Sequence, residues 1–419
     1  MKYFIWTIGC QYNEWDGACL KGFLDQNDLI ESSAKEADII IILACSVRQT
    51  AVDRIFGRVK NWRNNTDLKH TRLPARQGSD TVKVIARNKS DEAISIEKIA
   101  TVPHRHLAMT NSKLILATGC VLDADKKKFV EKGIKFFESG DFETLKNLIC
   151  CHSERTKRSE ESIKSRSFSA DSADQDDVKK PKKLISYLPK TCSYVPIMIG
   201  CNNFCSYCAV PYVRGREKSR PVNEVINDVK NLVKGKQKDI LLLGQNVNSY
   251  KYAFAELLEK LNNLDGDFKI GFISNHPKDM TDDIIEAVAR LPKIKKEIHL
   301  PLQSGSDEIL KAMNRPYTAE QYLKIIENCK LKIVNLVLTT DVIVGFPGET
   351  EEDFQKTLEI FKRVNFKQAY INKYSPRVGT AAFKLGDPIP WSEKQHRWRI
   401  LNKIVNSGNK AKTFNKKSK

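Results

Sequence analysis

Short apolar runs, each followed by a segment with helical spacing, fill the chain from Ser193 onward and constrain its fold more than any other feature. Runs of this kind are typical of β/α units, in which successive strands lie parallel in one sheet. The expected strands are residues 195–199, 240–243, 268–273, 298–300, 336–343 and 368–374. Six such units predict a partial (β/α)6 TIM-type barrel over residues 191–400.

A second α/β unit, residues 1–145, precedes the barrel and is predicted to be a Rossmann-like domain with a parallel sheet. Its expected strands and helices are residues 2–7, 14–24, 37–44, 50–62 and 113–118. A cysteine closely follows each of the three strands, namely Cys10, Cys45 and Cys120. Because parallel strands open their carboxyl ends toward one edge of the sheet, the three thiols are expected to converge there.

Three segments differ from these units in composition. Residues 64–111 show weak periodicity and contain two prolines and one glycine, which predicts an insertion in the first domain. Residues 146–190 include seven serines within 153–172, which predicts a flexible linker. Residues 401–419 carry several lysines and no acidic residue from Lys403 on, which predicts a disordered basic tail that contacts RNA in a salt-sensitive way.

The charge balance favours a polyanionic partner over a merely basic surface. The 419 residues include 70 basic and 51 acidic side chains, a net charge of +19, and nucleic acid is the usual partner of such a chain. The eleven cysteines are an odd number, and closely spaced thiols in a reducing compartment are more often metal ligands than disulfides. No apolar run approaches the roughly 20 residues of a membrane span, and no secretory signal is present, so we expect a cytoplasmic protein.

The sharpest motif is a C-x3-C-x2-C triad directly after the first strand of the barrel. Its members are Cys201, Cys205 and Cys208. Three thiolates on one loop bind three irons of a 4Fe-4S cluster and leave the fourth iron open, and an open iron is suited to chelate S-adenosylmethionine. A structural zinc site is the alternative, but it usually needs a fourth Cys or His nearby, and none follows in residues 209–212.

With this triad, the stretches 9–13, 45–48 and 118–121 resemble the radical S-adenosylmethionine methylthiotransferase family. The resemblance implies that Cys10, Cys45 and Cys120 bind a second 4Fe-4S cluster, and that S-adenosylmethionine is the cofactor. Family members usually continue after the barrel with a TRAM-like β-barrel that binds RNA, which we expect to be absent here.

Stretches 210–215, 243–250 and 275–277 most resemble the branch of the family that acts on N6-dimethylallyladenosine beside the tRNA anticodon. The resemblance implies that a radical formed from S-adenosylmethionine activates carbon 2 of that adenine, and that the N-terminal cluster carries the sulfur of the added methylthio group. N6-threonylcarbamoyladenosine as substrate and a non-catalytic iron-sulfur RNA-binding remnant are the alternatives. The implied partners are tRNA and a flavodoxin- or ferredoxin-type electron donor, and we expect a monomer.

Several residues near predicted strand ends are weaker candidates for cofactor contacts. Gln303, Ser304 and Asp341 lie where barrel enzymes build their active sites and are candidates for binding S-adenosylmethionine, although turn capping explains such residues equally well. His299 falls in an apolar strand, where core packing is the expected role.

Three further residues are candidate contacts to the RNA substrate. Arg214 and Arg216 closely follow the cysteine triad and could bind phosphates, although their alternate spacing also fits an exposed strand face. His276 could line the substrate entrance, or it could be an ordinary extended-chain residue before a proline.

Overall fold

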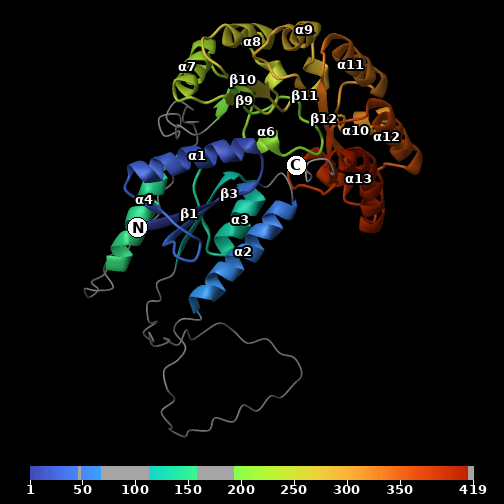
Figure 1. The fold of residues 1–419 in the computed structure, drawn as a ribbon. Coiled ribbons are helices and arrows are strands. Elements are labelled where there is room, and N and C mark those ends of the chain that lie inside the picture. The colour runs from blue at the N-terminus through green and yellow to red at the C-terminus, as the bar shows by residue number, and fades with distance from the viewer. Residues whose placement is uncertain (46–48, 68–112, 158–192, 414–419) are drawn as a thin grey trace, which may run out of the picture.

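The computed structural model describes residues 1–45, 49–67, 113–157 and 193–413. They form two α/β domains that lie against each other, the N-terminal sheet below and the larger barrel-like domain above in Figure 1. Residues 68–111 of the predicted insertion and residues 158–190 of the predicted linker lie outside the described residues. Residues 64–67, which were also predicted to belong to the insertion, are helical.

The N-terminal domain contains a five-stranded sheet with the strand order β2-β1-β3-β4-β5, in which every neighbouring pair is parallel. The strands are β1 (Lys2–Thr7), β2 (Ile30–Glu31), β3 (Ile39–Cys45), β4 (Leu114–Cys120) and β5 (Lys135–Phe136). This order is that of a doubly wound fold, whose switch point lies between the first and third strands. The prediction of a parallel Rossmann-like domain is therefore confirmed.

Helices cover both faces of this sheet, and this explains the uninterrupted apolar sequence of β3. The helices are α1 (Gln11–Gln26), α2 (Gln49–Asp67), α3 (Asp123–Glu131) and α4 (Phe142–Lys157). Ile39 and Ile41 of β3 pack with α1 and α4, whereas Ile40 and Ile42 face the core formed with α2 and α3. A strand buried on both faces needs apolar residues at every position, not at alternate ones.

The predicted flexible linker is wrong for residues 146–157, because they form the C-terminal part of helix α4. Leu145 and Ile149 of this helix are buried in the core of the N-terminal domain. These two residues are spaced by one helical turn, and their burial stabilises the segment despite its polar composition.

The second domain is a partial barrel of six strands in two parallel three-stranded sheets, with the orders β10-β9-β6 and β11-β12-β13. Its strands are β6 (Tyr194–Pro196), β9 (Asp239–Leu243), β10 (Lys269–Phe272), β11 (Glu297–His299), β12 (Val337–Val344) and β13 (Gln368–Lys373). Figure 1 shows the helices arranged in an arc outside these strands. This architecture confirms the predicted α/β barrel.

The helices of the barrel follow its strands in alternation. They are α7 (Val222–Lys234), α8 (Phe254–Asn262), α9 (Asp282–Arg290), α10 (Asp307–Ala312), α11 (Ala319–Lys332), α12 (Glu351–Val364) and α13 (Trp391–Thr413). One core joins strands and helices: Val342 and Val344 of β12 pack in the same cluster as Phe354 and Phe361 of α12. Because side chains alternate along a strand, the odd-numbered residues of β12 face the barrel interior.

The predicted disordered tail is wrong for residues 401–413, which continue helix α13. Leu401 and Val405 are buried in the core of the barrel domain. Residues 414–419 lie outside the described residues. Among the described residues, no strand follows β13.

Candidate functional site

The three N-terminal cysteines lie at the carboxyl ends of neighbouring strands. Cys10 follows β1 and is the N-cap of α1, while Cys45 and Cys120 end β3 and β4 and are register partners. The switch point of the sheet lies between β1 and β3, where doubly wound folds bind ligands. Cys45 and Cys120 are buried, Cys10 is exposed, and none of them is in a disulfide.

Asn13 holds the three strand ends together. Its side chain is fully buried, and its Nδ2 donates hydrogen bonds of 2.9 Å to the carbonyl oxygens of Ile8 and Ala44. The Cys120 thiol lies 3.5 Å from Asn13 Oδ1. Asn13 belongs to the stretch 9–13 that carries the family resemblance, but its sequence position alone gives no sign of this structural role.

The second triad lies on the loop between β7 (Met198–Ile199) and α6 (Val210–Val213) at the mouth of the barrel. Cys201 and Cys205 are buried, Cys208 is half-buried, and none is in a disulfide. Arg315, which the sequence did not single out, is buried and its Nη1 lies 3.5 Å from Cys205 Sγ.

Gly200 permits the tight approach of the loop that carries this triad. Its φ is +81°, and a Cβ there would lie 2.2 Å from the carbonyl oxygen of Arg216. Glycine is the residue that adopts this conformation without strain.

Both triads fit iron-sulfur clusters by the chemistry of their donors. Burial raises the pKa of Cys120 and of Cys208 to about 12, so these thiols are poor nucleophiles unless a metal deprotonates them. In the described part of the chain, no three potential ligands converge on a position for one metal ion. Three thiolates at each site suit a 4Fe-4S cluster, in which each thiolate binds a different iron.

Arg214, on the barrel-domain segment that follows Cys208, contacts the N-terminal triad across the domain interface. Its Nε donates a 2.7 Å hydrogen bond to Cys120 Sγ, and its Nη2 lies 3.1 Å from Asp16 Oδ2 in a buried ion pair. Burial disfavours the charge, but the nearby Cys120 and Asp16 outweigh this effect and raise the pKa of the Arg214 guanidinium. Arg214 therefore lies inside the protein, not on a surface that faces RNA phosphates.

The predicted cofactor residues occupy two different environments. Ser304 is fully buried, and its Oγ accepts a hydrogen bond from the backbone N–H of Ser306, as a turn residue would. Gln303 lies after β11, has a φ of +67° and forms an isolated β-bridge with Val342 of β12. Its buried Oε1 has no hydrogen-bond partner among the described residues. Asp341 faces the barrel interior, with its Oδ2 3.1 Å from His299 Nε2. His299 thus has a polar partner and is not a packing residue only.

The other two predicted substrate contacts, Arg216 and His276, also lie in different environments, one exposed and one buried. Arg216 is exposed, with its guanidinium 4.1 Å from the centre of the Phe204 ring. His276 is only 3% exposed, and burial, with a smaller effect of Arg315, lowers the pKa of its imidazole to about 2. His276 is therefore neutral and enclosed, which does not favour a role in binding phosphate.

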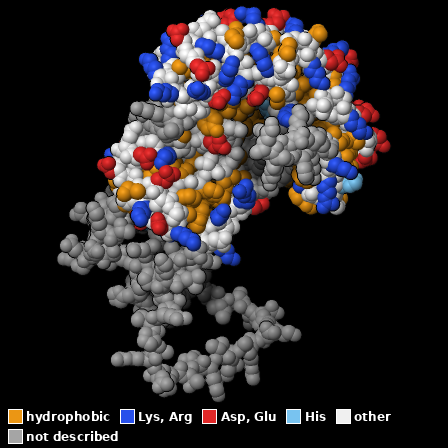
Figure 2. Space-filling model, in the orientation of Figure 1, with side chains coloured by type: hydrophobic (Ala, Val, Ile, Leu, Met, Phe, Trp, Pro, Cys, Tyr) orange, Lys and Arg blue, Asp and Glu red, His pale blue; other side chains and the backbone are white. Residues whose placement is uncertain are grey.

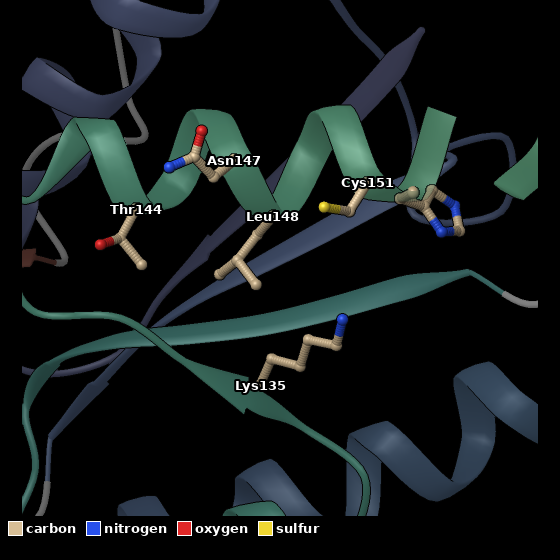
Figure 3. Close-up of a pocket in the computed structure, with 6 residues that line it drawn as sticks. Lys135, Thr144, Asn147, Leu148 and Cys151 are labelled. Atoms are coloured by element: carbon tan, nitrogen blue, oxygen red, sulfur yellow. The ribbon is translucent and has the colours of Figure 1, made fainter. Parts of the chain in front are cut away.

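A cavity of about 310 Å³ lies elsewhere, between β5 and α4 of the N-terminal domain. Figure 3 shows Lys135, Leu148 and Cys151 among the residues that line it. None of the six triad cysteines takes part in this cavity. In the described ranges, no helix combines the length and the apolar character that a membrane span requires.

The fold and its two thiol triads define a radical S-adenosylmethionine protein. Residues 195–361 match the family model described as Radical SAM superfamily, and residues 2–74 match the one described as Uncharacterized protein family UPF0004. A tRNA-2-methylthio-N(6)-dimethylallyladenosine synthase from Clostridium botulinum is 37% identical over 434 residues, covering 99% of this chain and 84% of that protein. The protein of the same name from Clostridium tetani is also 37% identical and covers 96% of this chain and 81% of its own length. The chain belongs to this synthase family.

A solved structure supports the arrangement of the fold. The radical S-adenosylmethionine methyltransferase TsrM from Kitasatospora setae, determined with cobalamin and a 4Fe-4S cluster bound, covers 91% of this chain and 74% of its own length, with a TM-score of 0.54. The two sequences are 12% identical, so the similarity concerns the fold alone.

Proposed function

We propose that this protein is a radical S-adenosylmethionine tRNA methylthiotransferase that adds a methylthio group to carbon 2 of N6-dimethylallyladenosine. The observation that carries the proposal is the pair of cysteine triads, one at the sheet switch point and one at the barrel mouth. Arg214, from the barrel-domain segment after Cys208, donates a hydrogen bond to Cys120 of the N-terminal triad. Relatives named for this activity span nearly the whole chain.

The two triads are the proposed ligands of two 4Fe-4S clusters. Cys201, Cys205 and Cys208 would hold one, and Cys10, Cys45 and Cys120 the other. When bound, such clusters supply an electron for the cleavage of S-adenosylmethionine and an open iron for the transferred sulfur. The protein supplies the enclosure, since four of the six thiols are buried.

The barrel interior is the proposed binding space for the cofactor and the adenine. The Asp341 carboxylate and the His299 imidazole fix each other's orientation, and Thr339 Oγ1 lies 2.9 Å from the second ring nitrogen of His299. The Tyr370 ring packs against His299 at a steep angle and is 45% exposed. An exposed aromatic ring next to polar side chains is suited to stack on a nucleobase.

The proposed macromolecular partners are tRNA and an electron donor of the flavodoxin or ferredoxin type. A net charge of +19 supports binding to RNA. On the face shown in Figure 2, Lys and Arg side chains are spread over the barrel domain and mixed with acidic ones. The net charge of the whole chain therefore supports RNA as a partner more strongly than any single basic patch on this face does.

The test is expression of the chain in a bacterial strain that cannot methylthiolate N6-dimethylallyladenosine, followed by mass spectrometry of tRNA nucleosides. The expected result is a methylthio derivative of that nucleoside. Cys120→Ala and Cys205→Ala should each abolish it, whereas Cys150→Ala, a change of an exposed cysteine outside both triads, should not. A product only on N6-threonylcarbamoyladenosine would identify the other substrate, and no product from a chain that binds about eight irons would overturn the enzymatic proposal.

A further inference from the structure

Arg214 is a barrel-domain residue whose side chain is surrounded by the N-terminal domain. The side chain is 8% exposed, with Nε 2.7 Å from Cys120 Sγ and Nη2 3.1 Å from both Asn13 Oδ1 and Asp16 Oδ2. Its guanidinium carbon lies 4.0 Å from the centre of the Tyr12 ring. One side chain thus contacts a sulfur, an amide, a carboxylate and an aromatic face.

The identity of this residue matters because a guanidinium presents its donors in a rigid planar fork. Asp16, whose side chain is 4% exposed, binds Nη2 and so orients the plane that directs Nε toward Cys120. Burying two charges is costly, and an apolar pair of similar volume would join two domains at least as well. The contact therefore provides something that packing alone does not, an N–H group directed at a sulfur atom.

The same residue also links the two triads along the chain. Only Ala209 and α6 separate Cys208 from Arg214. A displacement of the barrel loop that carries Cys208 would therefore act on the sulfur of Cys120 through one short helical turn.

We propose that Arg214 is a positioning residue that hydrogen-bonds the sulfur of Cys120 and raises the reduction potential of the cluster in the N-terminal domain. The inference rests on the proposed function, because it takes Cys120 as a cluster ligand. Hydrogen bonds to cluster sulfurs and nearby positive charge stabilise the reduced cluster, which carries one more negative charge than the oxidised one. Removing the donor should make the potential more negative.

The experiment uses the full chain with Cys201, Cys205 and Cys208 replaced by Ala, so that only the N-terminal cluster forms on anaerobic reconstitution. The potential is measured by reductive titration monitored by electron paramagnetic resonance. In this background, Arg214→Gln should shift the midpoint to a more negative value, and Arg214→Lys, which keeps the charge but loses the fork, should shift it less. Arg216→Gln is the matched control, because Arg216 is exposed and stacks on Phe204; its midpoint should not move.

The outcomes separate this inference from the proposed function. A chain that keeps Arg214 but binds no cluster in this background would overturn the proposed N-terminal ligands. About four irons per chain with an unchanged midpoint in Arg214→Gln would overturn only the role of Arg214. If Arg214→Gln alone fails to retain iron, Arg214→Lys decides: a midpoint equal to that of the parent overturns the inference, and a more negative one supports it.

Discussion

Replacing Asn13 should loosen the edge of the N-terminal sheet at which the three cysteines meet. The Asn13 amide is fully buried and donates to two strand-end carbonyls, those of Ile8 and Ala44. Each buried carbonyl left without a donor costs about 1–3 kcal/mol. Asn13→Ala should therefore destabilise these strand ends by about 2–6 kcal/mol, the sum for two groups.

The assay is amide hydrogen exchange of the full chain, read by mass spectrometry in peptides that cover β3 and β4. Since 1.4 kcal/mol corresponds to a factor of ten, protection should fall by about 30-fold or more. Asn13→Asp, which keeps the size but cannot donate, should behave similarly. Asn27→Ala is the matched control, because Asn27 is exposed and makes one hydrogen bond, to Phe23 O at the end of α1. Protection of β3 and β4 within about twofold of the parent in Asn13→Ala would refute the reasoning.

Three other changes have defined outcomes. Arg397→Met removes the ion-pair partner of the buried Glu349 and should lower the free energy of unfolding, measured in urea, by about 3–5 kcal/mol. Lys324→Met, at an exposed ion pair, should change it little. Equal urea midpoints for the two variants would contradict this. The pKa of the His276 imidazole is about 2 in the folded protein, so below about pH 6.5 the unfolded chain binds a proton there that the folded chain does not. The free energy of unfolding should therefore fall by about 2 kcal/mol from pH 7.5 to pH 5. His276→Gln should lose that part of the pH dependence. Gly200→Ala places a Cβ 2.2 Å from a backbone oxygen and should lower the bound iron from about eight to about four per chain. Gly215→Ala is the matched control, because its φ of +73° imposes a similar backbone strain but there is open space around its Cβ; it should keep the iron.

The convergence of the N-terminal cysteines was predictable because it depends only on local patterns and one topological rule. The apolar runs before Cys10, Cys45 and Cys120 have the length of buried strands. Parallel strands place their carboxyl ends at one edge, so a residue's position at a strand end fixes its place in the fold. This placement of the thiols does not depend on how many residues separate the strands in the sequence.

The position of Arg214 was not predictable, because its partners are distant in sequence. Asp16 is 198 residues away, and no periodicity near Arg214 carries information about it. The alternate basic residues 214, 216 and 218 suggest an exposed strand face, yet Arg214 is buried while Arg216 and Lys218 are exposed. Only the docking of the two domains separates them.

The predictions for residues 146–157 and 401–413 were wrong for one reason: apolar residues one helical turn apart outweigh a polar or basic composition. The basic residues after 401 suggest a disordered tail, but Leu401 and Val405 are one helical turn apart and both are buried. Leu145 and Ile149 have the same spacing at the start of the predicted linker and are buried as well. A pair of apolar residues at i and i+4 was enough in both places to attach a helix to an existing core.

Helix α1 packs against both domains and so fixes the position of one triad relative to the other. Leu20 and Leu24 pack into the core of the N-terminal sheet, whereas Trp15 and Cys19 pack in a cluster with Leu243 of the barrel strand β9. The same helix begins after Cys10 and carries Asp16, the partner of Arg214. Because one rigid helix contacts both cores and both sides of the ion pair, displacing one triad relative to the other would expose apolar surface and unpair a buried charge. The relative position of the two triads is therefore a property of the folded chain before any cofactor or RNA binds.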